Sequence, residues 1–139
     1  MVKVKITVDS RVNMKNIPKF KDEVLEQTSK RGKQILQENT PKHTGAGANA
    51  YKIIKSENQH TIRNEKKYLP WVNDGTGLYG PRHRRITPIH ARVLHFHWKG
   101  REWFLKSVKG QRPQKFVEKS MPEIVESIPE AVVIASKVL

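Results

Sequence analysis

The amino-acid sequence predicts an α+β fold in which an antiparallel β-sheet packs against a long N-terminal helix and a C-terminal helix. Three observations lead to this prediction. The first residues alternate between apolar and polar side chains, two long segments repeat apolar residues every three or four positions, and the segments between them alternate again around turn residues. Strands that follow one another directly favour an antiparallel sheet with helices on one face.

The N-terminal third is expected to form one strand and one helix. A strand is predicted over Val2–Val8, whose apolar side chains share one face, and Asp9 and Ser10 end it. A helix is predicted over Ile17–Glu38, because apolar residues fall on one stripe and Pro41 disfavours helix at the residue before it. Gly32 lies inside this helix, where a missing side chain lets a neighbour approach closely.

The middle of the chain is expected to contain strands and loops. A glycine-containing loop leads into a strand that begins near Tyr51, and residues 56–58 turn the chain into a second strand around residues 61–63. Residues 67–73 are assigned as a further, weaker strand before the turn at residues 74–77. Residues 79–90 are expected to be an extended basic loop.

The last third is expected to form a β-hairpin and a helical tail. Residues 92–98 alternate, Lys99 and Gly100 turn the chain, and residues 102–108 return. Apolar residues then recur at helical spacing to the C-terminus. Pro122 and Pro129 are expected to break or kink this tail, so one continuous helix is not predicted.

Length and composition limit the possible classes of protein. A chain of 139 residues fits a single domain over residues 1–139. The absence of cysteine excludes disulfides and thiol chemistry. The first residues lack the apolar core of a signal peptide, and no apolar run is long enough to span a membrane. We therefore expect a soluble protein that is made in the cytoplasm and has no membrane partner.

Positive charge is concentrated in the middle of the chain. The formal net charge is +14, and residues 81–115 contain ten lysines or arginines but a single acid, Glu102. Such a segment favours contact with a polyanion or an acidic partner, although a solvated loop explains it equally well. The residues predicted to contact nucleic acid or a partner are Arg82, Arg84, Arg85, Arg92, Lys99 and Arg101. Trp98 and Trp103 alternate along the predicted strands, which favours core packing over base stacking.

Histidines raise the question of a metal site. His95 and His97 share one face of a predicted strand, His83 or His90 could add a third ligand, and Glu102 and Asp74 are the nearby acids. A polar strand face or a subunit contact explains the pair more simply, so no metal and no cofactor are predicted. The sequence also lacks phosphate-loop, nucleophile-elbow and zinc-protease motifs, and the single acid of the basic segment does not favour a nuclease. We therefore expect no catalytic residues and no enzyme activity.

Four segments in order resemble the tail-completion, or head–tail joining, proteins of long-tailed double-stranded DNA phages, also called minor tail components. They are residues 41–45 (PKHTG), 68–76 (YLPWVNDGT), 88–98 (PIHARVLHFHW) and 110–117 (GQRPQKFV). The match extends from about residue 17 to the C-terminus. The chain departs from the family pattern at Asn73 and Asp74, and by the insertion of Gln114 and Lys115.

This resemblance implies a structural role in the virion rather than a reaction. Members of the family form rings, commonly six-fold, between the connector or stopper protein of the head and the tail tube protein, with DNA passing through the lumen. The implied location is the neck of the virion, after assembly in the host cytoplasm, and both a tail-terminator and a neck-adaptor role fit.

Subunit contacts are expected at two glycine-containing loops. The residues predicted for them are Thr44, Gly45, Gly47, Gly75, Thr76 and Gly77. The alternative reading of the whole chain is a free-standing basic protein that binds nucleic acid independently of sequence.

Overall fold

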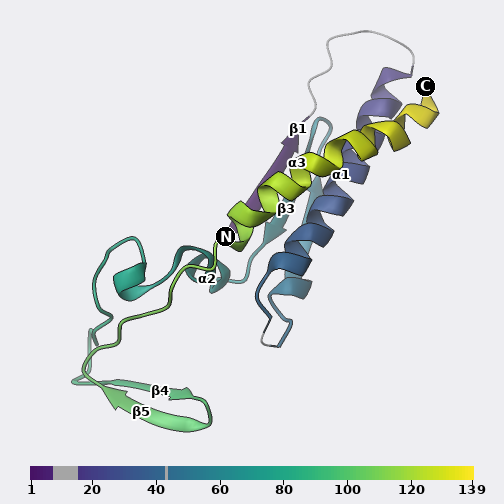
Figure 1. The fold of residues 1–139 in the computed structure, drawn as a ribbon. Coiled ribbons are helices and arrows are strands. Elements are labelled where there is room, and N and C mark those ends of the chain that lie inside the picture. Colours follow the sequence, from purple (N-terminus) through teal and green to yellow (C-terminus); the bar gives the residue numbers. More distant parts are fainter. Residues whose placement is uncertain (8–15, 43) are drawn as a thin grey trace. The chain divides into compact units, whose positions relative to one another are not determined.

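The computed structural model describes residues 1–7, 16–42 and 44–139, which form two compact units. Unit 1 comprises Met1–Lys67 and Phe116–Leu139, and unit 2 comprises Tyr68–Lys115 (Figure 1). Unit 2 is therefore an insertion in the sequence of unit 1. The expectation of a single domain over residues 1–139 stays a prediction.

Unit 1 contains a three-stranded antiparallel sheet. Its strands are β1 (Val2–Thr7), β2 (Tyr51–Lys55) and β3 (Gln59–Asn64), in the spatial order β1-β3-β2. The register sets Val4 and Ile53 on either side of Ile62, which is fully buried. The N-terminal strand and the hairpin at residues 56–58 are thus confirmed, whereas the predicted end of the first strand, at residues 8–10, lies outside the described residues.

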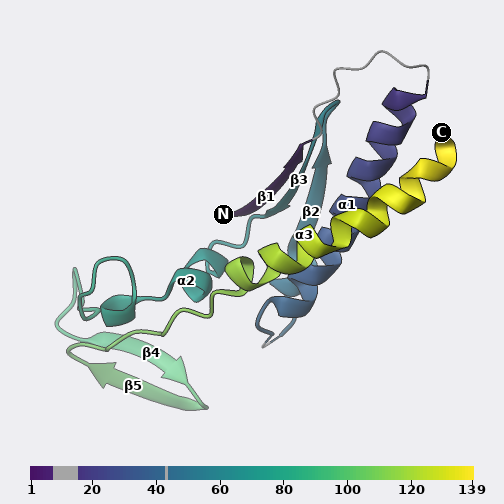
Figure 2. The ribbon, with the colours of Figure 1, turned by 45° about the horizontal axis from the view of Figure 1, so that its top comes forward.

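Two long helices complete unit 1 and confirm the α+β fold. Helix α1 (Ile17–Asn39) packs on the sheet, and α3 (Phe116–Ala135) packs along α1 (Figures 1 and 2). A Cβ atom at Gly32 would lie 2.9 Å from Cδ1 of Ile62 and 3.7 Å from Ile124, so the absent side chain lets α1 approach both β3 and α3. The close approach predicted at this glycine is confirmed.

Helix α3 runs through both of its prolines, so the predicted interruption of the C-terminal tail is wrong. Pro122 and Pro129 both lie inside the helix and are exposed, while Phe116, Ile124 and Ala135 on another face are buried. Each proline removes one backbone donor from the helix. Burial of the opposing apolar face compensates for that loss, and a short 3-10 turn (Ser136–Val138) ends the chain.

Unit 2 consists of a short helix, loops and one hairpin. Residues assigned as a weak strand form helix α2 (Leu69–Asp74), with Pro70 in its first turn, so the strand prediction is wrong. Proline cannot donate to a strand ladder but is well accommodated where a helix begins. The predicted hairpin is confirmed as β4 (Leu94–Trp98) and β5 (Arg101–Leu105). Across the described ranges of both units, no helix is long and apolar enough to cross a membrane.

Candidate functional site

Unit 2 has almost no hydrophobic core of its own. Leu69 is the one buried hydrophobic residue among those described in this unit, whereas several large apolar side chains are exposed. The exposed fraction reaches 61% for Trp71, 88% for Ile89 and 60% for Phe104. A surface of this kind is typical of a segment that contacts another molecule.

The β4–β5 hairpin has two chemically different faces. One face carries Phe96, Trp98 and Trp103, with Leu94 opposite Leu105 at the open end, and borders a hollow of about 570 Å³. Lys99 lies 4.4 Å from the ring centre of Trp98, and Arg101 lies 4.9 Å from that of Trp103. Cations held over indole rings suit contact with phosphates and with stacked bases.

The prediction that Trp98 packs in the core is wrong. Its side chain is 56% exposed, and Trp103 is half-buried, with its indole nitrogen donating a hydrogen bond to the carbonyl of Trp98. A two-stranded hairpin has no second layer of its own to cover an apolar face. The alternation of residues along the strands was predicted correctly, but the burial of that face was not.

The predicted arginine loop lies exposed beside the DGTG turn. Arg82, Arg84 and Arg85 line a hollow of about 610 Å³ together with Trp71 and residues 75–77. The Nε of Arg85 donates to the hydroxyl of Ser107 at 2.9 Å, and Ile86 and Val108 form an isolated bridge close by. Arg92 is exposed just before β4. All six predicted basic contact residues therefore lie in unit 2.

The glycines of the DGTG turn have a structural role that the sequence did not reveal. The amide of Thr76 donates to the carbonyl of Gln111 at 2.9 Å, and the amide of Gln111 donates to the hydroxyl of Thr76 at 2.8 Å. A Cβ atom at Gly77 would overlap the carbonyl oxygen of Lys109, and one at Gly110 would overlap that of Thr76. Two of the four segments that carry the family resemblance thus meet in space, and their glycines permit the close crossing.

The first glycine loop belongs to unit 1. Thr44 is exposed and Gly45 is half-buried, so both are available to a partner. Gly47 is buried, and its carbonyl accepts a hydrogen bond of 2.7 Å from the side chain of Asn64. Gly47 is therefore part of the internal packing of unit 1, and the two predicted contact loops lie in different units.

Helix α3 exposes a stripe of apolar residues along part of its length. The stripe consists of Met121, Val125, Ile128 and Val132, which are exposed by 41%, 57%, 38% and 37%. Their spacing of four, three and four residues places them on one line along the helix. The periodicity was visible in the sequence, but α3 is apolar around more than one face and periodicity alone does not say which face is covered.

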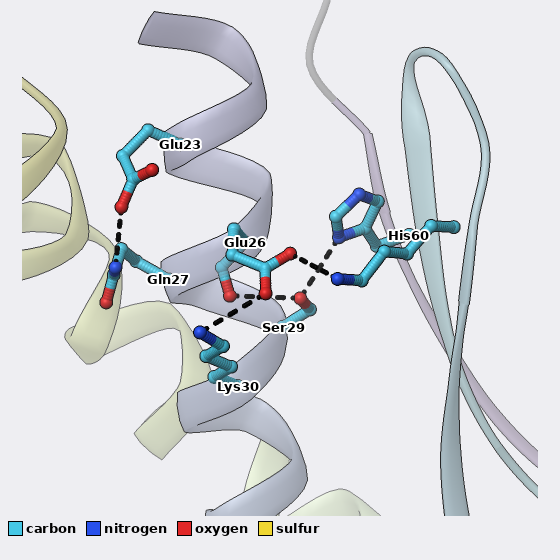
Figure 3. Close-up of polar contacts among 7 residues, drawn as sticks. Glu23, Glu26, Gln27, Ser29, Lys30 and His60 are labelled. Carbon is cyan, nitrogen blue, oxygen red and sulfur yellow. Dashed lines mark hydrogen bonds and ion pairs between the residues drawn. The ribbon is translucent and has the colours of Figure 1, made fainter. Parts of the chain in front are cut away.

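A polar network joins α1 to the sheet (Figure 3). Glu26 lies between Lys55, at 2.7 Å, and Lys30, at 3.3 Å. The hydrogen bond from Lys55 is the main cause that lowers the pKa of Glu26. These residues border an open groove of about 970 Å³ between α1, β2 and α3.

The same network contains a serine–histidine pair. Ser29 Oγ lies 3.1 Å from Nδ1 of His60 and also donates to the carbonyl of Glu26 (Figure 3). Ser29 is completely buried and His60 is 6% exposed. A nucleophile needs access to its substrate, so this arrangement fits a satisfied core hydrogen bond rather than a catalytic pair.

The structure brings His95 and His97 together with Glu102. The Nε2 atoms of the two histidines lie 3.5 Å and 3.0 Å from the same carboxylate oxygen, and all three side chains are exposed. The predicted third ligands, His83 and His90, are not part of this group, and neither is Asp74.

Comparisons with protein-family models, curated proteins and solved structures found no match for this chain, so the resemblance to phage tail-completion proteins stays a prediction.

Proposed function

We propose that this chain is a structural subunit of a phage neck ring, where it completes the tail and joins it to the head connector. In this role it has no enzymatic activity, and its partners are further copies of itself, the connector or stopper protein and the tail tube protein. Double-stranded DNA passes through the lumen of the ring. The resemblance of the four sequence segments supplies the identity of the assembly.

The observation that carries the proposal is the presence of two unlike apolar surfaces on one chain. The α3 stripe is aliphatic and lies on a segment, residues 116–139, with four glutamates and two lysines. The second surface is the hairpin face of Phe96, Trp98 and Trp103, on which Trp98 is 56% exposed, in a unit with ten basic residues. The segments that carry the two surfaces are opposite in net charge, so the surfaces are suited to each other rather than to themselves.

Two complementary surfaces on one chain favour a head-to-tail contact. Such contacts are heterologous, and repeated copies close into a ring when the rotation between neighbours permits it. The shortage of core in unit 2 fits the same arrangement, because burial against a neighbour supplies the apolar contact that this unit lacks.

The mass of the full chain in solution, measured by light scattering after size-exclusion chromatography, tests the proposal. We expect a discrete oligomer, or a monomer that forms one with the connector and tube proteins, and we expect Val125→Lys to abolish it. Val133→Lys is the matched control, because Val133 is also exposed on α3 but lies about 100° around the helix from Val132. A stable monomer that joins neither partner would contradict the ring, and equal effects of the two variants would exclude the stripe as the contact.

The second candidate is a free-standing protein that binds nucleic acid independently of sequence. The cation–aromatic pairs of Trp98 with Lys99 and Trp103 with Arg101 favour it. Fluorescence anisotropy with single-stranded and duplex oligonucleotides would then show tight, salt-sensitive binding by the monomer, weakened for single strands by Trp98→Ala. Binding that requires the assembled oligomer would favour the neck ring instead.

A further inference from the structure

The register of the β4–β5 hairpin gathers three potential metal ligands on one face. His95 and His97 are two residues apart on β4, so their side chains point to the same side of the strand. Glu102 on β5 pairs directly with His97 and lies diagonally across from His95. The carboxylate therefore faces both imidazole rings, although it comes from a different strand.

The distances suit a small divalent cation. Two ligands about 2.0–2.1 Å from a tetrahedral metal are about 3.3 Å from each other. The two Nε2 atoms lie 3.0 Å and 3.5 Å from one oxygen of Glu102, and the three ligand atoms all lie within 4.8 Å of one another. Small side-chain rotations are enough to bring the two imidazoles onto a common ion.

One of the rings is already held in place. The imidazole of His95 stacks on Phe104, its cross-strand partner, with ring centres 4.5 Å apart and planes inclined by 5°. Stacking fixes the plane of the ring without using either of its nitrogens. A ligand that is oriented before the metal arrives loses less entropy on binding.

The local charge does not oppose a cation as strongly as the composition suggests. Glu102 is the single acid in the basic segment 81–115, and it lies in this group. The nearest cations along the hairpin, Lys99 and Arg101, lie over the rings of Trp98 and Trp103. By strand alternation, Arg101 and both tryptophans belong to the face opposite the histidines.

We propose that His95, His97 and Glu102 form a binding site for one late first-row divalent cation, with Zn²⁺ as the expected ion. Imidazole nitrogens with one carboxylate are ligands that suit zinc, and three protein ligands leave a fourth position for water or a group from another molecule. The bound ion links β4 to β5. Because a lone two-stranded hairpin is marginally stable, an ion that binds the folded hairpin alone stabilises it.

Zinc titration of the tag-free full chain tests this site, with binding followed by competition against a chromophoric chelator at neutral pH. We expect one strong site per chain. His97→Ala and Glu102→Gln should each weaken zinc binding by at least ~10-fold, since even outer-shell partners of metal ligands are worth about 10–100-fold. His90→Ala is the matched control, because His90 is an exposed histidine of the same unit that lies outside the group, and it should leave the affinity unchanged.

A second measurement guards against variants that disturb the hairpin. Amide hydrogen exchange of residues 94–105 in the wild type should slow on addition of zinc and return to its original rate with a chelator. A wild-type chain that binds no zinc at one equivalent would overturn the proposal. Equal weakening by His90→Ala and His97→Ala, or unchanged hydrogen exchange in the hairpin, would overturn it as well.

Discussion

Thr40 and Tyr51 show how two polar side chains are satisfied in the core of unit 1. Their exposed fractions are 2% and 3%, and the Thr40 hydroxyl lies 2.6 Å from the Tyr51 hydroxyl. Thr40 also donates to the carbonyl of Leu36, so the tyrosine must be the donor in the bond between the two hydroxyls. The pair ties the end of α1 to the beginning of β2.

Replacing Tyr51 by phenylalanine should lower the free energy of unfolding by about 0.5–1.5 kcal/mol, the usual net worth of such a hydrogen bond. Thr40→Val should cost more, about 1–3 kcal/mol, because it leaves the buried tyrosine hydroxyl without an acceptor. Urea unfolding of both single variants and the double variant measures the coupling. Additive effects would show that the two hydroxyls do not interact.

The same pair predicts a loss of stability in alkaline solution. Burial raises the pKa of the Tyr51 hydroxyl above its ordinary value. The unfolded chain therefore releases the tyrosine proton at a lower pH than the folded chain does. The free energy of unfolding should decline as the pH rises from about 10, the ordinary pKa of tyrosine, toward the higher pKa of the folded state. The unfolding free energy of the wild type should fall relative to Tyr51→Phe in this range, and parallel pH curves would contradict the assignment.

At the level of elements, α3 is held by its packing rather than by its own helix propensity. Pro122 and Pro129 each cost the helix a backbone hydrogen bond, yet the helix is continuous from Phe116 to Ala135. Its buried face contacts α1. Ser120 on this face accepts a hydrogen bond from Asn39 at the end of α1. Local preference predicted an interruption, and tertiary contact overrode it.

Pro129→Ala should raise the free energy of unfolding by up to ~3 kcal/mol, because alanine has a higher helix propensity than proline. The gain is reduced because proline also lowers the entropy of the unfolded chain, and alanine does not. The site is exposed, so the change removes little packing. Circular dichroism during urea unfolding measures the effect, and Pro88→Ala, in a loop, is the control with little expected gain. A less stable Pro129→Ala chain would mean that the proline itself is needed for the native helix.

At the level of the whole molecule, the basic residues form separate sets with different surroundings. The arginine loop of unit 2 borders a hollow, whereas Lys3, Lys5 and Lys52 lie exposed on the strands of unit 1. Net charge alone predicts that both sets contact nucleic acid equally. The surroundings of the two sets predict that the arginine loop contributes more to nucleic-acid binding than the lysines of unit 1 do.

Changing Arg82, Arg84 and Arg85 together to alanine should weaken duplex DNA binding and reduce the salt dependence of the affinity. The slope of log affinity against log salt should fall by up to ~2.7, at ~0.9 for each phosphate that the variant no longer neutralises. Changing Lys3, Lys5 and Lys52 to alanine removes the same charge from unit 1 and is the matched control. Equal changes in slope would show that the total charge, and not the loop, determines binding.

Elements with strong, local residue patterns were predictable from the amino-acid sequence. Alternation predicted β1 and the β4–β5 hairpin, helical spacing predicted α1, and Gly32 marked a close approach. These features depend on neighbours a few residues apart, which the sequence displays directly. The family resemblance and the role it implies also came from the sequence, and they stay predictions.

Which apolar faces are covered, and which side chains meet, could be read from the three-dimensional structure alone. It left the α3 stripe and Trp98 exposed, used the glycines of the DGTG turn for a backbone crossing, and set Glu102 opposite His97. The physical reason is that burial and ligand geometry depend on contacts between residues far apart in the sequence or on different strands. A pattern within one segment indicates the shape of that segment, but it does not indicate what lies against it.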